Sequence, residues 1–170
     1  MPVLIPRGDG MQLVGVGGRG VFSYDPVSGK ELWKARHRGW SIAPRPVYGN
    51  GLLFAIIDRD NPELWAMRPD GNGDVTDTHV AWRETKRMPA RASPLLVDDM
   101  LFLVNRNGIA TCLEAATGKL HWQKRMDGEY SASPIYNKGR IYLFSENSAC
   151  TVIRAARELE ILSVNSLFDE

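Results

Sequence analysis

Long apolar runs and a surplus of one charge are both missing from the 170 residues. The longest apolar stretches, such as residues 101–104, fall far short of the roughly 20 residues that cross a bilayer, so the sequence predicts no membrane span. The 21 basic residues are balanced by 20 acidic ones, which leaves a net charge of +1. Proteins that bind nucleic acid carry a basic excess, so we expect no nucleic-acid partner.

Cysteine is scarce, with only Cys112 and Cys150, and no CxxC pair is present. Two cysteines this far apart do not make a disulfide framework, and both are expected to be small buried apolar residues. Three scattered histidines add no zinc-site spacing. The first residues lack the long apolar core of a signal peptide. The chain is therefore expected to be either cytoplasmic or a piece of a longer protein.

No segment before residue 150 has the 3.6-residue apolar period of an amphipathic helix. The sequence instead contains a repeat. A shift of 40 residues aligns 91–122 with 131–162 without a gap, and places Ala-Ser-Pro on Ala-Ser-Pro. An earlier unit aligns from Pro46 to Trp82 with eight extra residues at 70–77. Residues 12–33 are interpreted as an incomplete first unit.

Each unit is predicted to form four short strands, which in the third unit cover about 93–97, 100–105, 109–114 and 120–124. Asn107-Gly108 is a strong hairpin signal between two of them. A repeating four-stranded unit of this length is typical of a propeller blade. The predicted fold is all-β, a partial or half β-propeller of about four four-stranded antiparallel blades in one domain, 1–170. The approximate blade ranges are 10–40, 41–89, 90–128 and 129–170.

Residues 23–33 and 112–122 share the pattern small–x–acid–x–x–Thr/Ser–Gly–Lys–x–x–Trp. This pattern resembles the tryptophan-docking motif of PQQ-like, or quinoprotein-type, β-propeller repeats. That family includes PQQ-dependent alcohol dehydrogenases and cofactor-free members such as the barrel-assembly-machinery lipoprotein. The resemblance implies that the tryptophan of one blade stacks on the next blade's turn, which the acid caps. The residues given this blade-docking role are Trp33, Trp82, Trp122, Asp25, Glu114, Gly29 and Gly118.

The fourth unit departs from the motif, because Arg157, Glu158 and Leu162 stand where threonine, glycine and tryptophan are expected. That joint is expected to dock more weakly or differently. Complete rings in the family have more than four blades, and the chain ends at 167–170, where another blade would start. We therefore expect a fragment of a longer propeller, or a half-propeller that pairs with a second copy to complete the ring.

The resemblance leaves two functions open. Quinoprotein dehydrogenases hold PQQ under a vicinal Cys-Cys pair, which this sequence lacks. The favoured prediction is a non-enzymatic repeat scaffold without a cofactor, which binds a protein or polymer through its blade loops. The alternative is a fragment of a PQQ-dependent quinoprotein oxidoreductase. By resemblance, the protein is expected in the periplasm or another extracytoplasmic location.

Two surface regions are candidate sites. The insertion at 70–77 has spaced oxygen side chains, but valine and alanine stand where an EF-hand loop needs glycine and glutamate, so a solvated hairpin is favoured over a weak calcium site. The calcium candidates are Asp70, Asn72, Asp74 and Asp77.

Three loops lead from a tryptophan strand to the next blade and are predicted to share one rim near the axis. The candidate binding rim is Arg36, Arg38, Trp40, Arg87 and Arg91, although plain structural loops are favoured over a binding surface.

Overall fold

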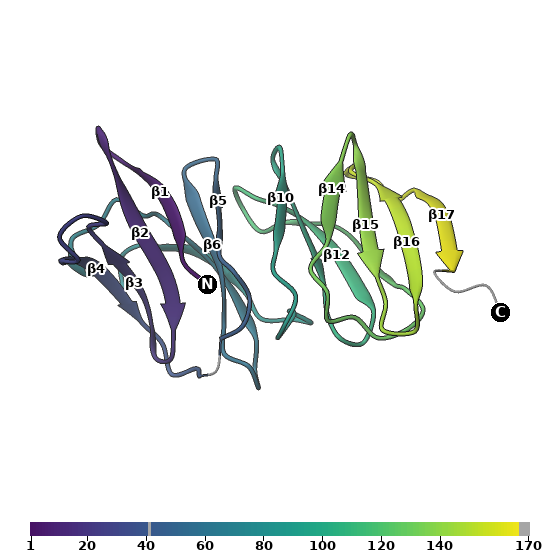
Figure 1. Ribbon diagram of the computed structural model, residues 1–170, viewed down its shortest axis with the longest axis horizontal. Helices are drawn as coiled ribbons and strands as arrows, with labels where there is room; N and C mark the ends of the chain where they lie inside the picture. The colour runs from purple at the N-terminus through teal and green to yellow at the C-terminus, as the bar shows by residue number, and fades with distance from the viewer. Residues whose placement is uncertain (41, 167–170) are drawn as a thin grey trace.

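The computed structural model describes residues 1–40 and 42–166, and all its regular elements are β-strands (Figure 1). Seventeen strands form four sheets. In the described part of the chain, no helix has the length and apolar character needed to span a bilayer. The expected start of a further blade at 167–170 lies outside the described residues.

Each sheet contains an antiparallel meander of four strands in chain order, and we call these four meanders blades 1 to 4. In each blade, the pairing of the third and fourth strands contains one register shift. Blade 1 consists of β1 (Val3–Arg7), β2 (Gly10–Gly17), β3 (Gly20–Tyr24) and β4 (Glu31–Arg36). Blade 2 consists of β5 (Val47–Gly49), β6 (Leu52–Ile57), β7 (Glu63–Met67) and β9 (Val80–Glu84). Blade 3 consists of β10 (Leu95–Val97), β11 (Met100–Val104), β12 (Ile109–Glu114) and β13 (Leu120–Arg125). Blade 4 consists of β14 (Ile135–Asn137), β15 (Arg140–Phe144), β16 (Ala149–Arg154) and β17 (Ile161–Ser166).

The all-β fold of four four-stranded blades confirms the prediction, but blade 1 begins earlier than expected. The repeat predicts an incomplete first unit that begins near residue 10, whereas β1 pairs along β2 from Val3 opposite Val14 to Arg7 opposite Gly10. The alternating pattern of β1 explains why it pairs there. Ile5 is buried in the core, while its neighbour Leu4 points to solvent.

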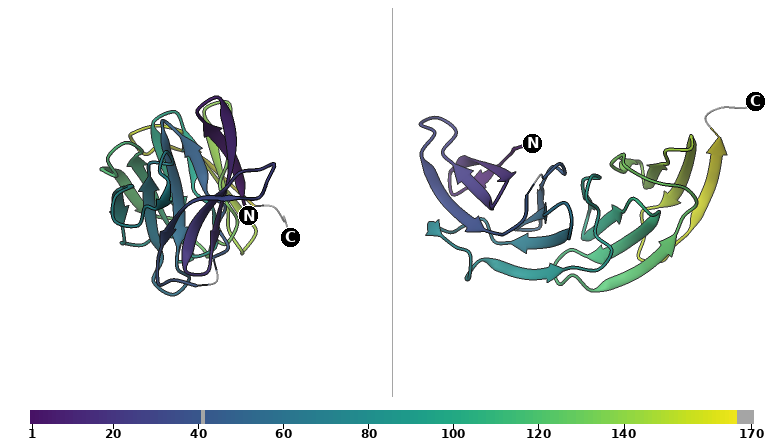
Figure 2. Two further views of the ribbon diagram at one scale, coloured as in Figure 1. Left: turned by 90° about the vertical axis from the view of Figure 1, so that its left-hand side faces the viewer. Right: turned by 90° about the horizontal axis from the view of Figure 1, so that it is seen from below.

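The four blades lie side by side along an arc (Figure 2). Inner strands β1, β5, β10 and β14 line its concave side, and outer strands β4, β9, β13 and β17 its convex side. A repeated hydrogen bond links the segments that lead into the inner strands of blades 2, 3 and 4. The amide of Arg45 donates to the hydroxyl of Ser93 at 2.9 Å, and the amide of Ser93 donates to that of Ser133 at 2.9 Å.

The hydrophobic core consists of three layers, one in each joint between neighbouring blades. Strand β6 contributes to two of them. Leu53 and Ala55 pack toward blade 1, while Phe54 and Ile56 pack toward blade 3. A middle strand that is buried on both faces has a continuous apolar sequence, and residues 52–57 have one. This packing is what the propeller prediction requires of the middle strands.

The insertion in blade 2 is not the solvated hairpin that the sequence favoured. Its strand β8 (Gly73–Asp74) pairs in parallel with the outer edge of β4, and so adds a fifth strand to blade 1. The amide of Val75 donates to the carbonyl of Lys34 at 2.8 Å. Val75 itself is only 3% exposed and packs in the core beside Trp33. The insertion docks because an outer strand has free backbone groups and Val75 finds an apolar site beside it.

The meander gives the molecule two loop-bearing faces. The segments that lead from one blade to the next share a face with the hairpins between second and third strands, and we call this the connection face. The remaining turns, including 25–30 and 114–119, form the opposite turn face. Because the connection face collects loops from every blade, it is where side chains distant in sequence come together.

Candidate functional site

Trp82 docks blade 2 onto blade 3. Its indole N–H donates to the carbonyl of Ala115 at 3.1 Å, and its ring lies against Gly118, which has a φ of +74°. The turn closes through the amide of Gly118, which donates to the carbonyl of Glu114 at 2.8 Å. The hydroxyl of Thr117 also donates a hydrogen bond to the Glu114 carboxylate. The shared Thr-Gly pattern thus builds a platform for a neighbouring indole.

Asp25 caps the corresponding turn of blade 1. Its Oδ1 accepts hydrogen bonds from the amide of Ser28 at 2.7 Å and the amide of Val27 at 3.1 Å. The hydrogen bonds from Ser28 are the main cause that lowers the pKa of Asp25. Gly29 in this turn has a φ of +71° and no neighbouring atom within 4 Å of an added β-carbon, so no indole stacks on it among the described residues.

At the joint between blades 3 and 4, the tryptophan docks one residue further along the turn of the next blade. Trp122 donates to the carbonyl of Ala156 at 3.1 Å, whereas the position equivalent to Ala115 is Ala155. Arg157, which replaces the motif's threonine, instead forms an ion pair with Asp99 of blade 3. The sequence change at this turn therefore goes with a different contact.

Trp33 differs from the other two tryptophans. It is completely buried, and its indole N–H donates to Oε1 of Gln12 in its own blade at 2.7 Å. Oε1 of Gln12 also accepts from the hydroxyl of Ser23 at 2.6 Å. The insertion replaces the short turn on which Trp33 would dock, so no carbonyl of that turn accepts from its indole. Trp33 instead belongs to the same buried cluster as Val75 of the insertion.

The four calcium candidates are directed to different partners. Asp74 accepts hydrogen bonds from Thr76 at 2.5 Å and from Arg36 at 3.0 Å, which lower its pKa to about 2. Asn72 accepts from Arg7 at 2.9 Å. Asp70 lies 3.5 Å from His79, and no partner of Asp77 is described. Within residues 1–40 and 42–166, no group of three His, Cys, Asp or Glu is arranged to hold a metal ion.

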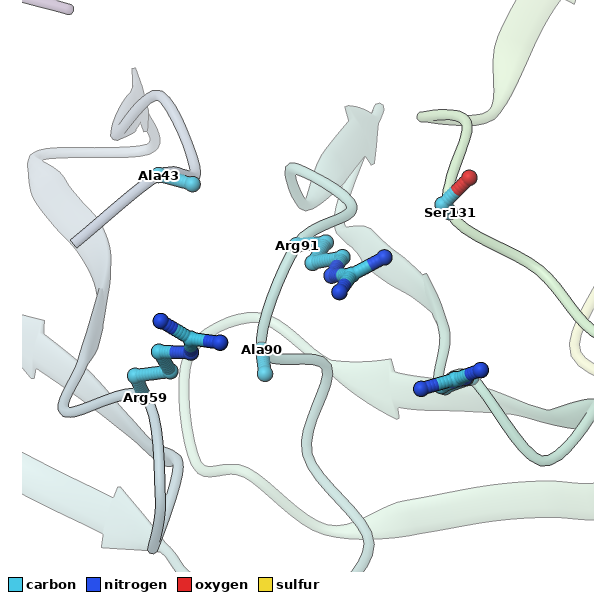
Figure 3. Close-up of a pocket in the computed structure, with 6 residues that line it drawn as sticks. Ala43, Arg59, Ala90, Arg91 and Ser131 are labelled. Atoms are coloured by element: carbon cyan, nitrogen blue, oxygen red, sulfur yellow. The ribbon is translucent and has the colours of Figure 1, made fainter. Parts of the chain in front are cut away.

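A cavity of about 530 Å³ opens on the connection face, between the loops of consecutive blades. Figure 3 shows Arg59 extending from one loop toward Ala90, and Arg91 extending from the next loop toward the side of Ser131. Three arginines from separate loops therefore meet at one cavity. Its lining is Ala43, Arg59, Ala90, Arg91, Arg106 and Ser131.

The three guanidinium groups of this cavity are unequally neutralised. Arg106 donates to Oε2 of Glu129 at 3.1 and 2.9 Å, and this contact raises the pKa of Arg106. Arg59 lies 5.7 Å from the ring centre of Trp40, and Arg91 has no hydrogen-bond or ion-pair partner among the described side chains. The cavity therefore carries uncompensated positive charge. Arginine forks of this kind recognise carboxylates by paired hydrogen bonds.

Trp40 is exposed on the same face. Its indole N–H donates to Oδ2 of Asp60 at 3.1 Å, beside Arg59. An exposed tryptophan flanked by arginine is a residue combination enriched where proteins bind one another. Sequence reasoning singled out Trp40 and Arg91 but missed Arg59 and Arg106. Those two lie in tight hairpins, which the repeat alignment treats only as turns.

The predicted rim is divided in the structure. Arg36 lies on the outer strand β4 and pairs with Asp74. Arg87 reaches Gln123 of the next blade's outer strand. Arg38 lines a separate pocket of about 290 Å³ with Asp58 and other residues. Of the five, only Arg91 lines the 530 Å³ cavity, and Trp40 lies near it through its contact with Arg59. The five are divided because the connecting loops run from the outer edge of one blade to the inner edge of the next.

Comparisons with known proteins agree with this architecture. Residues 71–159, more than half of the chain, match the sequence profile of the family described as outer membrane protein assembly factor BamB. A relative of that name from Moranella endobia (strain PCIT) is 26% identical over 106 residues, which are 62% of this chain and 25% of the relative. The chain thus spans about a quarter of that relative's length.

Solved structures share the fold at low sequence identity. BamB from Moraxella catarrhalis superimposes with a TM-score of 0.70 and 16% identity, over 92% of this chain and 49% of that one. The quinohemoprotein alcohol dehydrogenase ADHIIG from Pseudomonas putida HK5 gives 0.72 and 15%, over 97% and 33%. The β-propeller domain of Myceliophteria thermophila Cps50 (Swd1) gives 0.62 and 13%, over 96% and 59%. These likenesses concern the fold alone.

Proposed function

This chain belongs to the family of the outer membrane protein assembly factor BamB, and from that membership we propose that it is a non-enzymatic β-propeller scaffold which binds a protein partner in bacterial outer membrane assembly. Its location is then the periplasm. The chain covers only part of its relatives, so the proposal concerns the contribution that these four blades make.

The observation that carries the proposal is the connection face. It presents the exposed Trp40 beside a cavity with the uncompensated Arg91 and Arg59. Such a surface offers an apolar anchor and paired hydrogen-bond donors, the two features that dominate many protein interfaces. Loops held by rigid blades keep these groups in place before a partner arrives.

Outer membrane assembly in the bacterium that encodes the chain provides the test. Removing the gene is expected to lower the amount of folded outer membrane β-barrel protein, measured by the different gel migration of heated and unheated samples. The wild-type gene should restore it, while Arg59→Glu combined with Arg91→Glu should not, because the charge of the cavity is reversed.

A matched control changes two lysines on the turn face. Lys30→Glu combined with Lys119→Glu makes the same change in net charge away from the connection face, and should restore assembly fully. If both double variants restore assembly equally, the connection face is not the functional surface.

The quinoprotein alternative has its own measurement. PQQ and calcium are added to the purified protein, and reduction of an artificial electron-acceptor dye by an alcohol is followed. We expect no PQQ-dependent rate. A PQQ-dependent rate that disappears when calcium is chelated would replace the scaffold proposal with an oxidoreductase.

A further inference from the structure

The outer edge of blade 1 shows how these blades accept an additional strand. Lys34 is bridged to Asp74 in the parallel pairing of β4 with β8, and its carbonyl accepts from Val75 at 2.8 Å. The amide of Arg36 donates to the hydroxyl of Thr76 at 2.9 Å. Next to these backbone contacts, Nε of Arg36 lies 3.0 Å from the Asp74 carboxylate. An acid–apolar–hydroxyl segment therefore fits along this edge.

Blade 3 repeats the same edge without such a strand. Trp122 pairs with Cys112 as Trp33 pairs with Ser23, so Gln123 is equivalent to Lys34 and Arg125 to Arg36. The amide of Met126 donates inward to Gly108 at 2.8 Å, and antiparallel ladders alternate, so the backbone groups of Gln123 and Arg125 point away from β12. No described strand pairs with this side of β13.

The surroundings of β13 favour an acidic and partly apolar segment. Cavities of about 380 and 390 Å³ flank Gln123, one lined by Lys124 and Arg125, the other by Met88 and the exposed Leu120. Nη1 of Arg125 donates to the carbonyl of Asn107 at 2.9 Å, and its other N–H groups can meet an acid as Nε of Arg36 meets Asp74. Trp122 is only partly buried, whereas Trp33 is fully buried in a cluster that includes Val75.

We propose that the outer edge of β13 is a second protein-binding site, which takes an extended acidic segment of a partner by parallel strand addition. An aspartate or glutamate of the segment faces Arg125, and the following β-branched residue lies beside Trp122. Main-chain hydrogen bonds to Gln123 supply affinity, as in other strand-addition complexes. The site lies on the convex side and is independent of the connection face.

The peptide Gly-Ser-Gly-Asp-Val-Thr-Val-Asp amide, with fluorescein on its N-terminal amine, serves as the probe, and its binding to the full chain is followed by fluorescence anisotropy. The matched peptide carries N-methyl groups on both valines, which are alternate residues. It therefore lacks the backbone N–H donors that pair with a neighbouring strand. We expect the unmodified peptide to bind and the methylated one to bind about tenfold more weakly, the loss expected from one or two main-chain hydrogen bonds.

Two chain variants locate the site. Gln123→Pro removes an outward amide from β13, and Arg83→Pro makes the equivalent change on β9; proline is tolerated on such edges. Only Gln123→Pro should weaken binding, and the peptide should slow hydrogen exchange at Gln123. The proposal is overturned if the two peptides bind equally or not at all, or if protection appears on the connection-face loops instead. Because the methylated peptide acts on the unaltered chain, the test holds even if a variant unfolds.

Discussion

The ring of Trp82 lies directly over Gly118 of the next blade. A β-carbon added to Gly118 would come 2.8 Å from Cε3 of that ring. The glycine of the repeated motif is therefore required for two reasons, its positive φ and the close approach of an indole. The same motif in blade 1 meets only the first requirement, because nothing lies within 4 Å of an added β-carbon at Gly29. The two glycines form a natural pair for experiment.

We expect Gly118→Ala to destabilise the protein more than Gly29→Ala does. Both variants place alanine at a φ above +70°, which costs about 1 kcal/mol each. Only Gly118→Ala also forces Trp82 away from its platform, which costs about 1–3 kcal/mol more. Urea unfolding followed by tryptophan fluorescence gives both free energies of unfolding. Equal losses would mean that the stacking of Trp82 contributes nothing to the joint.

Val75 tests whether the insertion is part of the core. Val75→Ala should lower the free energy of unfolding by roughly 2 kcal/mol, because it removes buried methyl groups beside Trp33. Val27→Ala makes the same chemical change at a side chain that is 95% exposed, and should leave stability unchanged. Similar stabilities of the two variants would mean that the insertion is a solvated loop and not part of the core.

Asp74 predicts how stability depends on pH. Its pKa is about 2 in the folded chain, below the ordinary value of 3.8, because Thr76 and Arg36 donate hydrogen bonds to it. A group with a lowered pKa stabilises the fold fully above its unfolded value and ceases to do so as the pH falls through its folded value. Unfolding free energies between pH 5 and pH 2 should therefore fall more steeply for the wild type than for Asp74→Asn. Parallel curves would show that the hydrogen bonds from Thr76 and Arg36 to Asp74 are absent in solution.

Association of the 170-residue chain follows from its end blades. Apolar side chains are exposed on both, including Leu4 and Met11 on blade 1 and Ile135 and Tyr136 on blade 4. Exposed apolar surface of this kind promotes self-association. Light scattering on the purified chain should give a dimer or larger species. A monodisperse 19.0 kDa species that unfolds cooperatively would contradict this expectation.

The repeat made most of the fold predictable, because its signals are local. Asn107-Gly108 marks the turn between β11 and β12, and Gly108 adopts the positive φ that such a turn needs. Strand β1 was missed because the β1–β2 hairpin is four residues longer than the β10–β11 hairpin, so Pro2-Val3 falls out of the register in which it would match Pro94-Leu95. The docking of β8 was also missed, because two residues paired in parallel with a distant strand leave no periodic pattern.

The candidate site was less predictable than the fold. Arg91 and Trp40 stand out in the sequence as charged and aromatic residues in long loops. Arg59 and Arg106 join Arg91 only because consecutive blades bring their hairpins to one face. Nothing in the sequence separates Arg36 and Arg87 from Arg91. In the structure, however, Arg36 and Arg87 lie toward the outer edge, where Asp74 and Gln123 bind them. Which loop residues converge depends on blade geometry, which the sequence pattern does not contain.

Photo-crosslinking in living cells tests the scaffold proposal most directly. Benzoylphenylalanine replaces Trp40 on the connection face or, as the control, Val27 on the turn face, and the crosslinked products are identified by mass spectrometry. We expect a crosslink from position 40 to a protein of the outer membrane assembly machinery, which Arg91→Glu removes, and none from position 27. Crosslinks of equal yield at both positions, or a position-40 crosslink that Arg91→Glu leaves unchanged, would contradict it.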